Sequence, residues 1–102
     1  MTFTVIVEAA AEQDWHEAVM WYDEREPGVS HRLNVALREL LNTLAHQPER
    51  FLRATPRTRK AKVPPPWPYS VYFTVNTEHL EVKVLAIWHG SRNPAELRRR
   101  LK

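Results

Sequence analysis

The sequence predicts a single α+β domain in which a strand and two helices precede three further strands and a short C-terminal helix. Apolar residues alternate with a period of two near the N-terminus and again over residues 59–89. Between these segments, residues 9–47 carry apolar residues at the three- and four-residue spacing of a helix face. A chain of 102 residues forms one domain with a modest core. We therefore assign residues 1–102 to one domain.

The first strand and the first helix are predicted from a change of period at Ala9. Thr2–Glu8 is β-branched and alternating, which is typical of a strand. A helix follows and ends before Pro27-Gly28. Its spacing places Trp15 and Tyr22 on the core face, whereas Trp21 lies off this stripe and is the aromatic residue that we expect to be exposed or in contact with a partner. The stripe consists of Ala11, Trp15, Ala18, Val19 and Tyr22.

A second amphipathic helix is predicted after this joint. Ser30 is a candidate N-cap, although the helix could begin a residue or two earlier, and Pro48 ends it. The short joint indicates an antiparallel helical hairpin. The apolar stripe of the second helix consists of Leu33, Ala36, Leu37, Leu40, Leu41 and Leu44.

Two strands between Pro68 and Gly90 form the predicted centre of the sheet. Residues 69–75 alternate as a half-buried strand does, residues 76–79 supply a polar turn, and residues 80–88 are apolar on both faces. A strand that is apolar on both faces is covered on both sides, so we place this last strand in the middle of the sheet. It brings His89 and Arg92 to its far end.

A basic strand is predicted at the margin of the sheet over Arg59–Val63, because the prolines that follow confine a strand to an edge or to its end. Its lysines have two explanations, which stay open here: they prevent edge-to-edge aggregation or they contact phosphate. The last helix has Asn93 as its cap, Pro94 in its first turn, and Leu97 and Leu101 as apolar contacts. Its C-terminal end carries four cations, Arg98, Arg99, Arg100 and Lys102.

Charge is divided unevenly along the chain. Residues 1–49 carry nine acidic residues and three arginines, a formal charge of −6. Residues 50–102 carry twelve Lys and Arg residues and three acidic residues, a formal charge of +9. A basic half indicates nucleic acid, an acidic protein partner or both, beside the simpler explanation of a solvated surface.

Composition excludes several classes of protein. With no cysteine, a disulfide framework and a thiolate metal site are excluded, and we expect a reducing cytoplasm as the compartment. The five histidines lack metal-ligand spacing, and there is no Gly-rich phosphate loop, so we expect neither a metal nor a cofactor. We also expect no signal peptide and no membrane contact.

The chain resembles a known superfamily in its element order together with the segments WHEAVMWYDER, LNVALRELLNTLAHQPERF, PYSVYFTV and VKVLAIWHGSRNP. These are similar to ParE/RelE toxins of type II toxin–antitoxin (plasmid stabilisation) modules. The resemblance covers nearly the whole chain. It implies a helical hairpin packed on a small, mainly antiparallel sheet, an activity that arrests growth, and a cognate antitoxin with an acidic helical segment. Two assemblies remain open, a homodimer and a toxin–antitoxin hetero-oligomer.

The superfamily offers two targets, of which the RelE-like one is the ribosome with its mRNA. Metal-independent cleavage of RNA needs a base, an acid and cations that hold the phosphorane charge. Arg59, Lys60 and Lys62 on the edge strand are candidates for holding that charge. His89 is the candidate acid or base, and Arg92 the phosphate clamp.

The ParE-like target implied by the resemblance is DNA gyrase, and HGSRNP favours this branch. The last tyrosine is Tyr72, inside the sheet, whereas many RelE-like toxins carry a tyrosine near the end of the chain. We therefore favour a gyrase-binding toxin over an enzyme, with Arg98, Arg99 and Arg100 as target contacts. His89 keeps three interpretations: catalytic group, partner contact, or structural histidine that fixes the loop to Arg92. An inactive toxin-fold relative is the third hypothesis.

Overall fold

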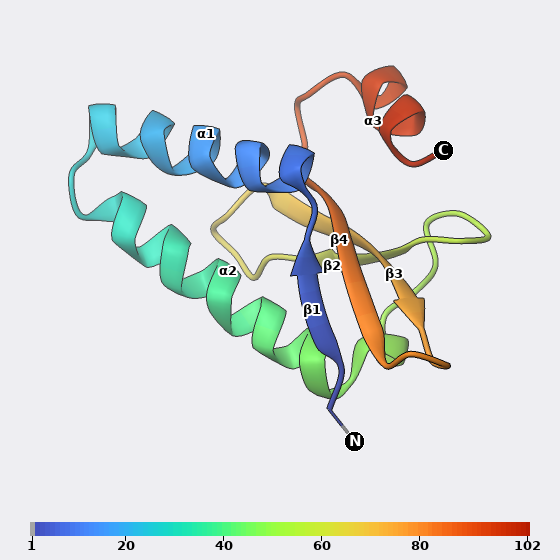
Figure 1. The fold of residues 1–102 in the computed structure, drawn as a ribbon. Helices are drawn as coiled ribbons and strands as arrows, with labels where there is room; N and C mark the ends of the chain where they lie inside the picture. Colours follow the sequence, from blue (N-terminus) through green and yellow to red (C-terminus); the bar gives the residue numbers. More distant parts are fainter. Residues whose placement is uncertain (1) are drawn as a thin grey trace.

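A computed structural model describes residues 2–102 and has the predicted order of elements (Figure 1). The elements are β1 (Thr4–Val7), α1 (Ala9–Arg25), α2 (Val29–His46), the 3-10 turn η1 (Pro48–Arg50), β2 (Arg59–Lys62), β3 (Tyr69–Asn76), β4 (Glu81–His89) and α3 (Pro94–Arg100). The α+β class and the helical hairpin predicted from the sequence are confirmed.

The four strands form one sheet in the order β1-β4-β3-β2. β1 runs parallel to β4, with Val5 opposite Val82, and the other two pairs are antiparallel. The sheet is therefore mainly antiparallel, β4 lies in its interior, and the basic strand β2 forms one edge, all as predicted. The register of β3 against β4 shifts between Tyr72 and Phe73, which leaves Leu85 of β4 without an opposite residue.

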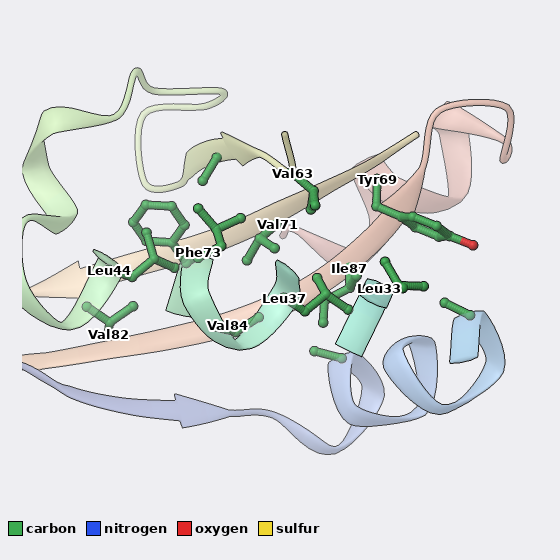
Figure 2. Close-up of a cluster of buried hydrophobic side chains, with 14 of the residues drawn as sticks. Leu33, Leu37, Leu44, Val63, Tyr69, Val71, Phe73, Val82, Val84 and Ile87 are labelled. Carbon is green, nitrogen blue, oxygen red and sulfur yellow. The ribbon is translucent and has the colours of Figure 1, made fainter. Parts of the chain in front are cut away.

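The inner face of the sheet, which we define as the face covered by α1 and α2, holds the main core (Figure 2). Phe73 and Val84, paired across β3 and β4, are fully buried there against Leu37 of α2. Burial of apolar area at about 25 cal/mol per Å² is the principal stabilising contribution in such a core. The labelled members in Figure 2 are Leu33, Leu37, Leu44, Val63, Tyr69, Val71, Phe73, Val82, Val84 and Ile87.

The opposite face, here called the outer face, has a much smaller apolar cluster. It consists of Tyr72, Ala86 and Trp88, against which Leu97 and Leu101 pack from the C-terminal end of the chain. The apolar contacts predicted for these two leucines are thus present, and the Asn93 side chain caps α3 by accepting from the N–H of Ala95 at 2.8 Å. No residue of α3 is fully buried.

Local details differ from the sequence-based predictions at two places. α2 begins at Val29, after Gly28 with a φ of 100°, and the Ser30 hydroxyl donates to Asp23 instead of capping the helix. Leu80, predicted to start β4, instead ends the turn with a φ of 51°, in a turn whose Asn76 side chain accepts from the N–H of His79. α2 thus begins two residues before the start that a Ser30 cap would give, as the prediction allowed, and β4 begins one residue later than predicted.

The three aromatic residues of α1 occupy the predicted environments in part. Trp15 and Tyr22 are half-buried at the border of the core, where the Trp15 indole donates to Asn34 of α2 at 2.8 Å. Trp21 is 49% exposed, as its position off the stripe predicted, and the guanidinium of Arg25 lies 4.1 Å from the centre of its ring.

Candidate functional site

A buried carboxylate organises the end of the sheet where β4 leads into α3. Asp14 lies in the second turn of α1, and its side chain is only 4% exposed. It accepts hydrogen bonds from the backbone N–H of Ile87 at 3.0 Å, from Arg92 at 3.0 Å and from Arg100 at 2.9 Å. A buried carboxylate of this kind is stable only because both its charge and its oxygens are paired.

Arg92 and Arg100 reach this carboxylate from two segments that are far from α1 in the sequence. Arg92 lies in the loop after β4, and its guanidinium stacks on the Trp88 ring at 3.8 Å from the centroid. Arg100 lies in the last turn of α3, and its guanidinium is 5.3 Å from the same centroid. Their side chains are 37% and 24% exposed, so each keeps part of its hydration. We call Asp14, Arg92, Arg100 and Trp88 the ionic cluster.

The ionic cluster forms where β4 extends beyond its parallel neighbour. β1 ends at Val7, opposite Val84, and β4 continues to His89. Backbone groups of β4 beyond this point therefore need other partners. Asp14 accepts from the N–H of Ile87, and Arg100 donates to the carbonyl of Leu85, the unpaired residue at the register shift, at 3.3 Å. The ionic cluster thus supplies hydrogen-bond partners to the backbone of β4 and holds α3 against this strand.

A cavity of about 280 Å³ lies beside the ionic cluster, between α1 and the ends of β3 and β4. Its apolar surface includes Ala18 and Ile87, and Tyr69 and His89 line it from the sheet. Burial, and secondarily the neighbouring Tyr22, raises the pKa of Tyr69 to about 12. Tyr69 is therefore a neutral hydroxyl over the physiological range.

His89 is held by two contacts at the edge of this cavity. Its Nδ1 accepts from the backbone N–H of Ser91 at 2.9 Å, and its ring meets Tyr69 edge to face at 5.2 Å between centroids. This is the geometry that the structural interpretation of His89 requires, because the first contact shapes the loop that carries Arg92. The catalytic and partner-contact interpretations stay predictions.

Of the residues proposed for holding phosphate, Arg92 lines the same cavity as His89, whereas Lys60 and Lys62 lie on the other face of the sheet. Lys60 and Lys62 flank Ala61, which is buried in the main core, so both lysines project from the outer face. His89 pairs with Tyr69, a member of the main core, and belongs to the inner face. The guanidinium of Arg59 donates to the backbone carbonyls of Glu49 and Phe51 and supports the segment before β2.

The three arginines proposed as target contacts do not share one environment. Arg98 and Arg99 are exposed, whereas Arg100 is bound by Asp14 and by the Leu85 carbonyl. The target-binding role of all three stays a prediction, but Arg100 has a structural role that the other two lack.

Asp14 was not among the candidate site residues predicted from the sequence. The signal that it is buried is its place in the apolar stripe, three residues after Ala11 and four before Ala18, both of which are buried. A carboxylate at such a position requires a cationic partner, and the surplus arginines near the C-terminus could have been matched to it.

Two further properties concern the described part of the chain. Among residues 2–102, no helix is long and apolar enough to cross a membrane. The same residues contain no group of three or more His, Asp or Glu side chains that could hold a metal ion.

Comparison of the sequence with known proteins identifies the family of the chain. Residues 5–94 match the family described as ParE toxin of type II toxin–antitoxin system, parDE. The chain is 34% identical over 91 residues to Toxin RelE1 of Caulobacter vibrioides. The match covers 88% of this chain and 96% of that protein.

Solved structures show the same fold. The chromosomal ParDE system of P. aeruginosa matches with a TM-score of 0.73 at 17% identity, over 86% of this chain and 96% of that one. The toxin–antitoxin complex RelBE2 of Mycobacterium tuberculosis matches with a TM-score of 0.62 at 18% identity, over 87% and 99%. With the family match over most of its length, the chain belongs to the ParE toxin family of type II toxin–antitoxin systems, within the ParE/RelE superfamily.

Proposed function

We propose that this chain arrests bacterial growth by binding DNA gyrase and that a cognate antitoxin holds it inactive. The family match and the relatives named above support the toxin role. The gyrase target is supported by one observation in particular: the lysines that would hold phosphate in an RNA-cleaving relative lie on the opposite face of the sheet from His89. The proposed site of action is the cytoplasm, where gyrase acts.

The positions of the proposed catalytic residues favour target binding over RNA cleavage. Cleavage of RNA requires a proton-transfer group and a phosphate-holding cation within hydrogen-bond reach of one phosphodiester. His89 belongs to the inner face of the sheet, and Lys60 and Lys62 to the outer face. Arg59 and Arg92 are bound to backbone carbonyls and to Asp14, respectively. His89 and Arg92 line one cavity, but the guanidinium of Arg92 is paired with Asp14, and neither Lys60 nor Lys62 lines that cavity.

Arg98 and Arg99 are the proposed gyrase contacts. Both are exposed on α3, and neither forms an ion pair within the described chain. Arg100 positions α3 through Asp14, so its replacement would change folding and target contact together. A double variant at Arg98 and Arg99 therefore separates binding from stability.

The antitoxin is proposed from relatives and from charge. The M. tuberculosis relative was solved as a toxin–antitoxin complex, and an archaeal RelE–RelB complex from Pyrococcus horikoshii matches with a TM-score of 0.58. A disordered acidic segment that folds on binding would complement the +9 charge of residues 50–102.

Pulse labelling of DNA and protein synthesis, immediately after induction without antitoxin, tests this proposal. We expect an early fall in DNA synthesis with translation intact, and inhibition of supercoiling by purified gyrase. An R98Q/R99Q variant expressed to the same level should lose both effects.

Two other outcomes would each replace the proposal. An early fall in translation that is lost in His89→Ala or Arg92→Ala favours the RelE-like ribonuclease, for which the exposed lysines of β2 remain available. Continued growth with both syntheses intact favours an inactive relative that serves in antitoxin binding.

A further inference from the structure

The strongest uncompensated charge on the sheet lies on its outer face. Lys60 and Lys62 project there from β2, and Lys83 projects there from β4, because it alternates with the buried Val82 and Val84. Arg53 and Arg57 extend the same charge through the loop before β2. We call these five residues the outer basic face.

No cation of the outer basic face forms an ion pair with another residue of the described chain. The ion pairs within residues 2–102 involve only Arg25, Arg92 and Arg100 among the cations. Protection of an exposed sheet edge explains lysines on β2. It does not explain Lys83, because β4 lies between β1 and β3 and has no free edge at that position. Edge protection therefore does not account for Lys83, which is exposed on the same face as Lys60 and Lys62.

A hollow of about 540 Å³ joins the loop arginines to Lys83. Thr74, which pairs with Lys83 across the strands, and Asn76 and Thr77 add hydroxyl and amide groups to its wall. Glu78 and Glu81 also line it, so its charge is mixed where the β3–β4 turn begins. Cations with hydroxyl and amide donors are the groups that contact phosphate oxygens in nucleic-acid complexes.

The low exposure of the aromatic residues on the outer face distinguishes between single-stranded and duplex nucleic acid as the ligand. Single strands are held by bases stacked on open aromatic rings. Tyr72 and Trp88 are only 8% and 4% exposed, because Leu97 and Leu101 cover them. The face therefore offers cations without stacking platforms, which suits the backbone of a duplex.

An acidic protein segment fits this face less well, so the proposed antitoxin would use the other cations of residues 50–102. A helical partner needs an apolar groove beside its charged contacts. The apolar residues of the outer face are already covered by the C-terminal leucines, and the strand neighbours of the lysines include Ser70 and Thr74.

We propose that the outer basic face binds the phosphate backbone of duplex DNA without reading its sequence. The inference rests on these charges and does not require gyrase as the target, although DNA contact would add to the affinity of a toxin for a DNA-bound enzyme. Lys60 and Lys62 are two residues apart on one strand, about 6.7 Å, so they can meet neighbouring phosphates.

Fluorescence anisotropy with a labelled duplex of about 20 base pairs tests the proposal over a range of salt concentrations. We expect the full chain to bind unrelated sequences equally and K60Q/K62Q/K83Q to bind at least about tenfold more weakly near 0.1 M salt. The slope of log K against log salt should fall by about 0.9 for each phosphate contact removed. The matched control R25Q/R32Q/R38Q removes three charges from the helical hairpin and should bind like the unmodified chain.

Several results would overturn the inference. These are no binding by the unmodified chain near 0.05 M salt, an equal loss in the control variant, tighter binding to single strands, or tighter binding to a polyglutamate of matched charge. Thermal unfolding of both triple variants establishes that each is folded. Supercoiling inhibition is measured separately: inhibition without DNA binding overturns this inference alone, and DNA binding without inhibition overturns the proposed gyrase target alone.

Discussion

The two faces of the sheet differ in how much apolar surface they bury and in how much charge they expose. The inner face buries Val71, Phe73 and Val84 completely under two helices. The outer face has a small apolar cluster under a seven-residue helix with no fully buried side chain. Its Trp88 indole N–H is buried without a partner among the described residues, a defect that costs about 1–3 kcal/mol. Stability therefore resides on the inner face, and the outer face is free to carry exposed charge.

The largest expected effect is on the inner face. Phe73→Ala should lower the free energy of unfolding by about 3–5 kcal/mol, because the ring is fully buried and packs edge to face on Phe51 at 6.0 Å. Thr74→Ala, on the outer face next to it, should change stability by less than about 0.5 kcal/mol. Urea unfolding compares the two variants. Equal losses would contradict the division between the faces.

The next effect concerns the ionic cluster that joins α1 to α3. Asp14→Ala should destabilise by about 2–3 kcal/mol, because Ile87 loses its acceptor while the half-exposed arginines can regain water. Hydrogen exchange should show faster exchange of the α3 amides. Glu17→Gln, an exposed change on the same helix, is the control. An Asp14→Ala variant as stable as the unmodified chain would show that the cluster does not hold α3.

A loss of folding stability of comparable size is expected at alkaline pH, where Tyr69 ionises. The pKa of Tyr69 is raised to about 12, so the folded state keeps a proton that the unfolded state releases near pH 10. This stabilisation is fully present below pH 10 and falls by roughly 2 kcal/mol as the pH rises through 12. Denaturant unfolding across this range measures the loss, and Tyr69→Phe should reduce the slope. A slope unchanged in Tyr69→Phe would assign it to other groups.

Much of the fold followed from periodicity, because the residues that alternate in β3 and β4 are the ones that pack. The continuous apolar run of β4 correctly placed it inside the sheet. The cap of α2 was less predictable: Ser30 is a residue type that commonly caps helices, but its hydroxyl bonds to Asp23 across the joint. Such a contact depends on how two helices meet, which no local pattern encodes.

The site was only partly predictable for a related reason. The three consecutive arginines Arg98, Arg99 and Arg100 cannot be told apart by residue type, but the helix directs their side chains to different sides. Arg100 meets Asp14 and the Leu85 carbonyl, which is free because the strand register shifts there. Arg98 and Arg99 remain in solvent. The partner of Arg100 is 86 residues away along the chain, so its role appears only in three dimensions.

The most direct test measures growth arrest and thermal unfolding on the same variants. R98Q/R99Q should unfold within about 3 °C of the unmodified chain and should no longer arrest growth. R32Q/R38Q, with the same change of charge on α2, should keep both properties. Growth arrest by R98Q/R99Q at equal expression, or a loss of activity that is caused only by unfolding, would contradict the proposed role of Arg98 and Arg99.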